Sequence, residues 1–223
     1  MLKYIIMIKL RNYLLSTLMV FFVAGVAKSQ EQPALKSKTF ERYFYNATKL
    51  PSEAGFMLTV DQTPLGSASI KDNRLFIDCK EGESYRIGLT SETDIKFNPQ
   101  GDYTVEFKVQ VPKNTGRGFD FMIKDGLNMS KLLVVHHNRI YFNGEKEAIM
   151  NVQSRTVPRV LRFAVERANG LMHIYVDGKF AKTVELNRRR SIPSLLFAKG
   201  NVNSATEIYI DYITVDESDA YAP

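Results

Sequence analysis

The chain has 223 residues, a single cysteine and a formal net charge of +6. One cysteine excludes an internal disulfide, so the core alone must stabilise the fold. Three of the 30 basic residues and none of the 24 acidic ones lie in residues 1–27, which leaves 27 basic residues, 24 acidic residues and a net charge of +3 for the rest. The charge therefore does not indicate a nucleic-acid partner.

Residues 1–27 predict a secretory signal peptide. Basic residues precede an apolar run from Tyr13 to Val26, and this run is too short to cross a membrane comfortably. It ends in Gly25-Val26-Ala27, whose small first and third residues suit signal peptidase. We expect a cleavable signal, export to the periplasm or the cell exterior, and no membrane span in the mature chain. The alternative is an uncleaved anchor.

A polar stretch, residues 28–39, contains Pro33 and predicts a short leader before the folded domain. We expect that domain to cover residues 40–217 and residues 218–223 to form a C-terminal tail. Its first aromatic residues, Phe40 to Tyr45, fit either a first strand or an irregular segment packed on the body. Prolines and glycines between Pro51 and Gly66 disfavour a long helix there.

Short strands separated by polar turns make up the rest of the predicted domain. The clearest is Tyr103–Val111, in which apolar and polar residues alternate, so that one face belongs to a core. Asp177-Gly178 lies between two alternating runs and predicts a hairpin turn. The other predicted strands are Ser67–Ile70, Leu75–Cys79, Tyr85–Thr90, Phe119–Lys124, Lys131–His136, Arg139–Phe142, Val160–Glu166, Met172–Val176, Phe180–Leu186, Ser194–Ala198 and Glu207–Val215.

This spacing predicts an all-β fold, either an antiparallel sandwich or a barrel. A parallel α/β sheet is disfavoured because it would need crossover helices between its strands. Cys79 lies in a predicted strand and is expected to be a small packed side chain. The run Arg188-Arg189-Arg190 predicts an exposed loop, with a contact for a phosphate or an acidic glycan as the alternative.

Three segments in order carry a resemblance to a known family. They are Gly101–Val109, then Arg162–Arg167 running into the hairpin Leu171–Lys179, and finally Ile208–Val215. Together they resemble the laminin-G-like branch of the concanavalin A-like lectin/glucanase superfamily. The resemblance implies a jelly roll of two stacked antiparallel sheets, one of them curved, with ligands on the concave sheet or at the loop rim. Because the superfamily holds lectins, hydrolases, lyases and adhesion modules, the fold does not settle the function.

The residues do not supply an evident pair of catalytic acids. The hydrolytic branch of this superfamily places its acids close together on one strand, whereas the nearest approach here is Glu207 to Asp211. Asp211 is expected to tie down a turn or loop. Glu106 and Asp120 come from neighbouring predicted strands and could meet, although a solvated glutamate is the plainer interpretation.

Metal ligands are also sparse. His136 and His137 are consecutive, so on a strand their side chains would point to opposite faces, unless a turn relaxes this. We therefore predict no metal site and no cofactor. The family leaves calcium open, with Asp102, Asp125 or Asp219 as loop ligands, but no dense acidic loop supports it.

A glycan-binding surface needs aromatic rings and polar groups that orient hydroxyls. Tyr141, Tyr175 and Tyr209 lie on predicted strands, and Tyr175 shares a face with His173 and Asp177. The chain lacks tryptophan, so Tyr175 as a sheet-covering aromatic is the alternative. The predicted ligand-binding residues are Tyr175, His173, Asp177, Glu106, Arg162 and Asp120.

The sequence as a whole favours a secreted, single-domain, non-catalytic module that binds a polysaccharide or another glycan. Two alternatives remain open at this point. One is a hydrolase or lyase of the same superfamily, and the other is an adhesion domain that recognises another exported protein.

Overall fold

A computed structural model describes residues 30–40, 44–58, 64–94, 96–199 and 203–223. The predicted signal peptide, residues 1–27, lies outside this range, and residues 32–223 form one compact unit. Within the described residues, no helix is long and apolar enough to cross a membrane.

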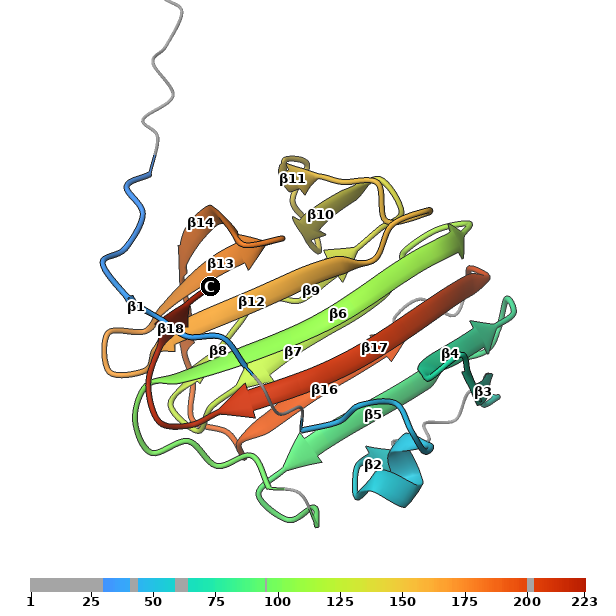
Figure 1. Ribbon diagram of the computed structural model, residues 1–223, viewed down its shortest axis with the longest axis horizontal. Helices are drawn as coiled ribbons and strands as arrows, with labels where there is room; N and C mark the ends of the chain where they lie inside the picture. The colour runs from blue at the N-terminus through green and yellow to red at the C-terminus, as the bar shows by residue number, and fades with distance from the viewer. Residues whose placement is uncertain (1–29, 41–43, 59–63, 95, 200–202) are drawn as a thin grey trace, which may run out of the picture. The chain divides into compact units, whose positions relative to one another are not determined.

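Two antiparallel sheets form the body of this unit (Figure 1). The first has seven strands and is called the β6 sheet here. In spatial order its strands are β14 (Lys179–Glu185), β13 (Leu171–Val176), β12 (Arg159–Glu166), β6 (Tyr103–Asn114), β17 (Thr206–Asp216), β4 (Arg74–Cys79) and β3 (Ser67–Lys71).

The second sheet has nine strands and is called the β7 sheet. Its main path runs through β11 (Ala148–Asn151), β10 (Arg139–Phe142), β9 (Leu133–Val135), β7 (Phe119–Lys124), β16 (Ser194–Lys199), β5 (Tyr85–Thr90) and β2 (Met57–Leu58). Off this path, β8 (Asn128–Met129) pairs with β7 and with β15 (Asn187–Arg188). The sheets stack as two layers, which confirms the predicted two-sheet antiparallel β-sandwich (Figure 1).

The core lies between the two sheets and is built from the inward residues of both. Phe107 of β6 is fully buried, and its ring lies 4.9 Å from that of Phe121 and 5.6 Å from those of Phe163 and Phe197. These contacts join both sheets, so the alternation predicted for Tyr103–Val111 is the pattern that positions the sandwich. Cys79 is buried in this core, as predicted.

Tight turns whose residues have left-handed backbone angles connect the two strands of each of two hairpins. Asp177 and Gly178 have φ angles of 50° and 77°, and they join β13 to β14 as predicted. Asp72 and Asn73, with φ angles of 52° and 56°, join β3 to β4 in the same way. Two successive residues with positive φ match the twist of the flanking strands, and Asp, Asn and Gly tolerate that conformation best.

The two ends of the described chain pair with each other. β1 (Lys36–Ser37) lies parallel to β18 (Tyr221–Ala222), although the sequence analysis assigned these residues to the leader and the tail. Before the first strands of the sandwich, Tyr45 forms a bridge with Ile213, and a short 3-10 helix, η2, spans Pro51–Ala54. The folded unit is therefore longer at both ends than residues 40–217.

Candidate functional site

Tyr175 and His173 lie on the outer face of the β6 sheet, as the alternation predicted, but other segments cover them. Tyr175 is 1% exposed and packs against Leu35 and against alanines near the end of the chain. His173 is 3% exposed, and its ring nitrogens contact Thr183 and Glu166. The structure therefore corrects the expectation of an open sugar-binding surface at this pair, because neither ring is accessible to a ligand.

Glu106 and Arg162 are buried in the same covered region. Arg162 Nε donates to Glu106 at 2.6 Å, and Arg162 Nη1 donates to the carbonyls of Lys38 and Ala222 at 2.8 and 2.6 Å. Tyr212 donates to the other oxygen of Glu106 at 2.8 Å. These bonds hold the two chain ends on the sheet, so here too the expected ligand-facing position is corrected.

Asp120 belongs to the other sheet and cannot meet Glu106. β6 and β7 are in different sheets, and both side chains point away from the core between them. Asp120 is 2% exposed and accepts a bond from Arg117 at 2.8 Å. Burial raises the pKa of its carboxyl to about 6, against the opposing effect of nearby cations. The predicted acid pair is therefore wrong, because a pair of acids must share one site to act together.

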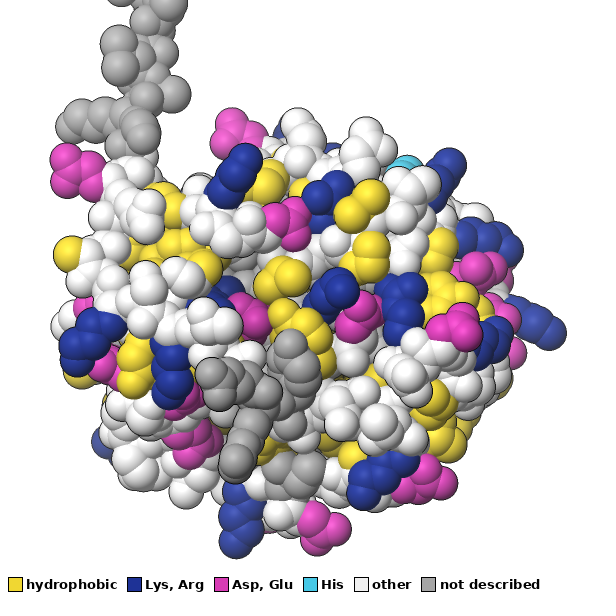
Figure 2. All heavy atoms as spheres, in the orientation of Figure 1, with side chains coloured by type: hydrophobic (Ala, Val, Ile, Leu, Met, Phe, Trp, Pro, Cys, Tyr) yellow, Lys and Arg dark blue, Asp and Glu magenta, His cyan; other side chains and the backbone are white. Residues whose placement is uncertain are grey.

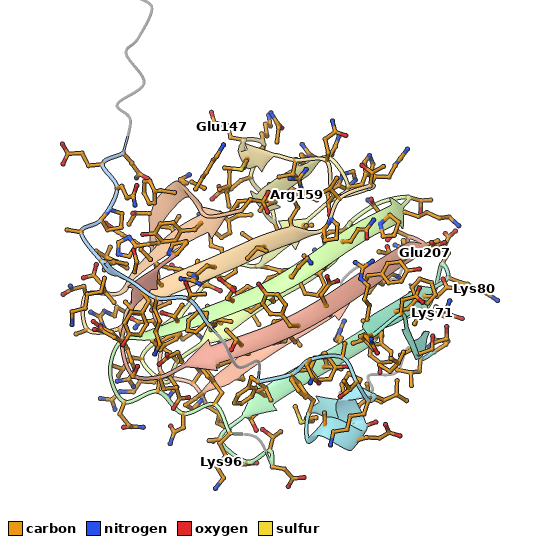
Figure 3. The ribbon with its side chains drawn as sticks, viewed as in Figure 1. Lys71, Lys80, Lys96, Glu147, Arg159 and Glu207 are labelled. Atoms are coloured by element: carbon orange, nitrogen blue, oxygen red, sulfur yellow. The ribbon has the colours of Figure 1, made fainter. Side chains whose placement is uncertain are left out.

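Asp177 is the predicted residue that the structure leaves exposed, in the turn between β13 and β14. Its carboxylate accepts a bond from Arg159 at 2.8 Å and from the backbone N–H of Val160 at 3.0 Å. The same side chain therefore fixes the turn and orients a guanidinium. Arg159 is the first residue of β12, and its side chain is labelled in Figure 3.

A pocket of about 260 Å³ opens beside Asp177 and Arg159, and we call it the rim pocket. Its other lining residues are Asn138, Met150, Asn151, Val152 and Gln153. They come from the turn between β9 and β10, from β11 and from the loop after β11. The pocket thus lies between an end of the β6 sheet and the edge strand of the β7 sheet.

Backbone bonds fix the walls of the rim pocket. Val152 N donates to the carbonyl of Asn138 at 2.9 Å, and Ser154 N donates to that of His137 at 2.8 Å. Asn138 Oδ1 lies 2.6 Å from His136 Nδ1. The pocket walls are therefore tied together before any ligand arrives, which lowers the entropic cost of binding.

The chemistry of the rim pocket suits hydroxyl groups. Carboxamides offer two donors and an acceptor each, while Arg159 supplies donors only and Asp177 acceptors only. Met150 and the buried Val152 add apolar surface to these polar groups. A few placed polar groups on an apolar wall are typical of sites that bind small polar molecules such as sugars. Among the described residues, Asp177 is the one carboxylate that lines the pocket, so this lining shows no paired acids.

Two larger hollows differ in character. One, of about 460 Å³, lies on the outer face of the β7 sheet and includes the apolar residues Met57, Met122 and Ile192. The other, of about 420 Å³, lies along β14 and includes Lys131 and Glu145, which form an ion pair at 2.6 Å. Neither contains a predicted ligand-binding residue, and neither is as rich in carboxamides as the rim pocket.

The histidines near the rim pocket lie between β9 and β10, which is the turn that the sequence analysis left open as an alternative to a strand. The rings of His136 and His137 lie with centroids 4.1 Å apart and planes tilted by 37°. Burial lowers the pKa of both. Among the described residues, no group of three or more His, Cys, Asp and Glu side chains is placed to hold a metal ion.

The aspartates left open for calcium have protein partners instead. Asp102 accepts a bond from Arg167 N at 2.8 Å, and Asp219 lies 3.5 Å from Lys36. Asp125 is fully buried and accepts bonds from the backbone N–H groups of Leu127 and Asn128. Each carboxylate therefore has a partner within the protein: backbone N–H groups for Asp102 and Asp125, and a lysine for Asp219.

The carboxamides of the rim pocket are the functional candidates that sequence reasoning missed. Asn151 and Gln153 lie in and just after β11, a strand that was not predicted. Without that strand, the residues between Phe142 and Val160 could not be placed at the same rim as Asp177. The sequence signal that pointed to this rim was the Asp177-Gly178 turn, which lies on the β6-sheet side of the pocket.

Several solved structures have a similar fold. A structure described as a sialidase has a TM-score of 0.58 and 11% identity, and covers 75% of this chain and 17% of that one. The potassium-bound carbohydrate recognition domain of Emp46p has a TM-score of 0.51 and 11% identity, and covers 79% of this chain and 99% of that domain. That of Emp47p has a TM-score of 0.50 and 15% identity, and covers 78% and 92%. This chain spans a small part of the sialidase but nearly the whole of each recognition domain.

At this level of identity the similarity shows the fold, which fits the expected concanavalin A-like sandwich. No protein-family model and no curated protein sequence matches the chain.

Proposed function

We propose that this protein is a non-catalytic glycan-binding module and that the rim pocket is its glycan site. The observation that carries the proposal is the joint presence of Asn151, Gln153, Arg159 and Asp177 around one hollow with an apolar wall. Such an arrangement pairs hydroxyl groups with both donors and acceptors. The fold shared with carbohydrate recognition domains supports the same proposal by analogy.

The proposal also covers the family branch, export and the absence of catalysis. The ordered motifs around Tyr103, Leu171 and Ile208 support a place in the laminin-G-like branch. The apolar run and small residues before residue 28 support export through a cleaved signal peptide. A paired-acid mechanism has no support at the rim pocket, where Asp177 already bonds Arg159.

The test begins with an array of neutral and acidic polysaccharides, followed by calorimetry on the best neutral binder. The variant Asn151→Ala/Gln153→Ala removes two exposed carboxamides, neither of which makes a hydrogen bond with another described side chain or backbone group. We expect it to weaken binding at least tenfold, about the value of one or two hydrogen bonds. Glu147→Gln is the matched control, because Glu147 is exposed on the same side of the molecule but does not line the pocket (Figure 3).

The outcomes separate the competing functions. Equal binding by the double variant and the wild type would place the glycan elsewhere on the protein. New reducing ends during incubation would favour a hydrolase, and the absence of any binding across the array would favour a protein-binding adhesion domain.

A further inference from the structure

The outer face of the β6 sheet carries a second arrangement of polar and aromatic side chains, away from the covered region around Tyr175. It lies on β3, β4, β17 and β6, where the register brings Phe76 beside Tyr209 and Lys71 beside Arg74. The rings of Phe76 and Tyr209 are 4.7 Å apart. We call Lys71, Arg74, Lys108, Phe76 and Tyr209 the basic platform.

Arg74 is held in one orientation on this platform. Its Nε donates to Asp211 at 2.6 Å and its Nη2 donates to Gln110 at 3.0 Å, while the guanidinium carbon lies 4.5 Å from the centre of the Tyr209 ring. A guanidinium held over an aromatic ring in one orientation is pre-organised for a planar anion. Neither Asp211 nor Gln110 accepts a hydrogen bond from Nη1 of Arg74.

Lys71 brings a second cation to the platform. Its Nζ lies 3.6 Å from the centre of the Phe76 ring, and the side chain is exposed. Among the described residues it has no carboxylate partner within ion-pair distance. Figure 3 shows Lys71 at the same side of the sheet as Glu207. The positive charge of Lys71 is therefore compensated by a ring alone.

Two of the three platform cations share one carboxylate partner. Lys108 lies 2.8 Å from Asp211, so that Lys108 and Arg74 share one carboxylate. The next carboxylate along β17, Glu207, pairs with Lys113 at 3.3 Å. Figure 2 shows this part of the face as hydrophobic surface set among basic and acidic side chains. Asp78 lies on the same face but at the other end of β4, opposite Glu207. Among the described residues, Asp211 is thus the one carboxylate that pairs with Lys71, Arg74 or Lys108, which lie beside an apolar floor.

We propose that the basic platform binds the carboxylate or sulfate groups of an acidic polysaccharide. The proposal rests on the proposed glycan-binding function and adds a separate site that selects charged chains. Fixed guanidinium and ammonium groups attract such anions, and the attraction weakens as salt screens it. The aromatic floor adds apolar surface against which a sugar ring packs.

The test compares three polysaccharides that differ in their charged groups. Polygalacturonate carries carboxylates, dextran sulfate carries sulfates, and unmodified dextran is the neutral reference. Binding is measured by affinity electrophoresis at low and high salt. We expect Lys71→Gln/Arg74→Gln to weaken retention by one or both acidic polymers at least tenfold, to reduce its salt dependence, and to leave the neutral reference unchanged.

A matched control carries the same loss of charge at another place. Arg189→Gln/Arg190→Gln removes two exposed cations from the run that the sequence predicts as an exposed loop, with an anion contact as the alternative. If this control weakens acidic binding as much as the platform variant does, the attraction is a general charge effect and the proposal fails. Loss of binding in the control alone would place the anion site at the arginine run.

Two further outcomes keep the proposal separate from the proposed function. Lys71→Glu changes an exposed side chain whose charge interacts with the Phe76 ring, so it tests the platform even if Arg74→Gln disturbs folding. If the wild type binds no acidic polymer, the platform proposal is overturned whatever the neutral array shows. Neutral binding could be lost in Asn151→Ala/Gln153→Ala while Lys71→Glu leaves the binding of acidic polymers unchanged. That result would support the rim pocket as a glycan site and overturn the platform proposal.

Discussion

Arg162 Nε donates to Glu106 Oε2 at 2.6 Å, with both side chains less than a tenth exposed. This pair lies under the paired chain ends, and Arg162 also bonds the carbonyls of Lys38 and Ala222. One guanidinium therefore neutralises a buried carboxylate and fastens two distant segments to the sheet.

Replacing Arg162 by methionine should strongly destabilise the protein. The change leaves the Glu106 carboxylate buried without its cation, which costs about 3–5 kcal/mol of unfolding free energy. Urea denaturation measures this loss. In the double variant Glu106→Gln/Arg162→Met much of it should return, since no charge then remains unpaired. Arg159→Met, which breaks an exposed pair, is the control and should cost less than about 1 kcal/mol.

Tyr175→Phe should leave the protein as stable as the wild type or more stable. The Tyr175 hydroxyl is buried and has no hydrogen-bond partner among the described residues. Burying such a group without a partner costs about 1–3 kcal/mol, and phenylalanine removes that cost while keeping the ring. Thermal unfolding followed by circular dichroism tests this. A clear loss of stability would reveal a partner for the hydroxyl, such as a buried water.

The Asp120 carboxyl should make stability depend on pH. Burial raises its pKa from 3.8 to about 6 in the folded state, so the folded protein holds this proton more tightly than the unfolded chain. Protonated Asp120 therefore contributes to the free energy of unfolding. This contribution is complete below pH 3.8 and is lost as the pH rises through about 6. Near this carboxyl, Arg117, Arg86 and Lys199 act in the opposite direction.

The variant Asp120→Asn isolates that effect. Its stability relative to the wild type should rise by about 1–3 kcal/mol between pH 4 and pH 7, as the wild-type carboxyl ionises. Denaturant unfolding of both proteins over this range provides the measurement. A constant difference between the two proteins would show that Asp120 titrates as an ordinary surface carboxyl.

Cys79 should not react in the folded protein. It is fully buried, and burial raises the pKa of its thiol to about 11, whereas the reactive form is the thiolate. Ellman's reagent should therefore label one thiol in denaturant and essentially none under native conditions. Fast native labelling would mean that β4 separates from its neighbours far more often than a core strand should.

The regular part of the fold followed from local pattern. Alternation along β6 and the Asp177-Gly178 turn both depend on neighbouring residues, and the structure confirms both. β11 escaped prediction because its four residues are all partly or fully exposed, so they show no alternation of apolar and polar side chains.

The candidate site was harder to predict because it depends on contacts between distant segments. Alternation correctly placed Tyr175 on the outer face, but nothing local indicates that Leu35 and the chain's last residues cover it. Likewise, Glu106 and Asp120 are close in sequence, yet the chain crosses from one sheet to the other between them. Pairing between short distant strands leaves no periodic signal in the sequence.

The parallel arrangement of β1 and β18 also determines how the domain would respond to tension. Because the two strands run in the same direction, a force that separates Lys36 from Ala222 draws them past each other along a common axis. Their hydrogen bonds, with those from Arg162 to both ends, are then loaded together and not opened one after another. Tension applied to the two ends of the domain would therefore load the β1–β18 pair before it loads the sandwich.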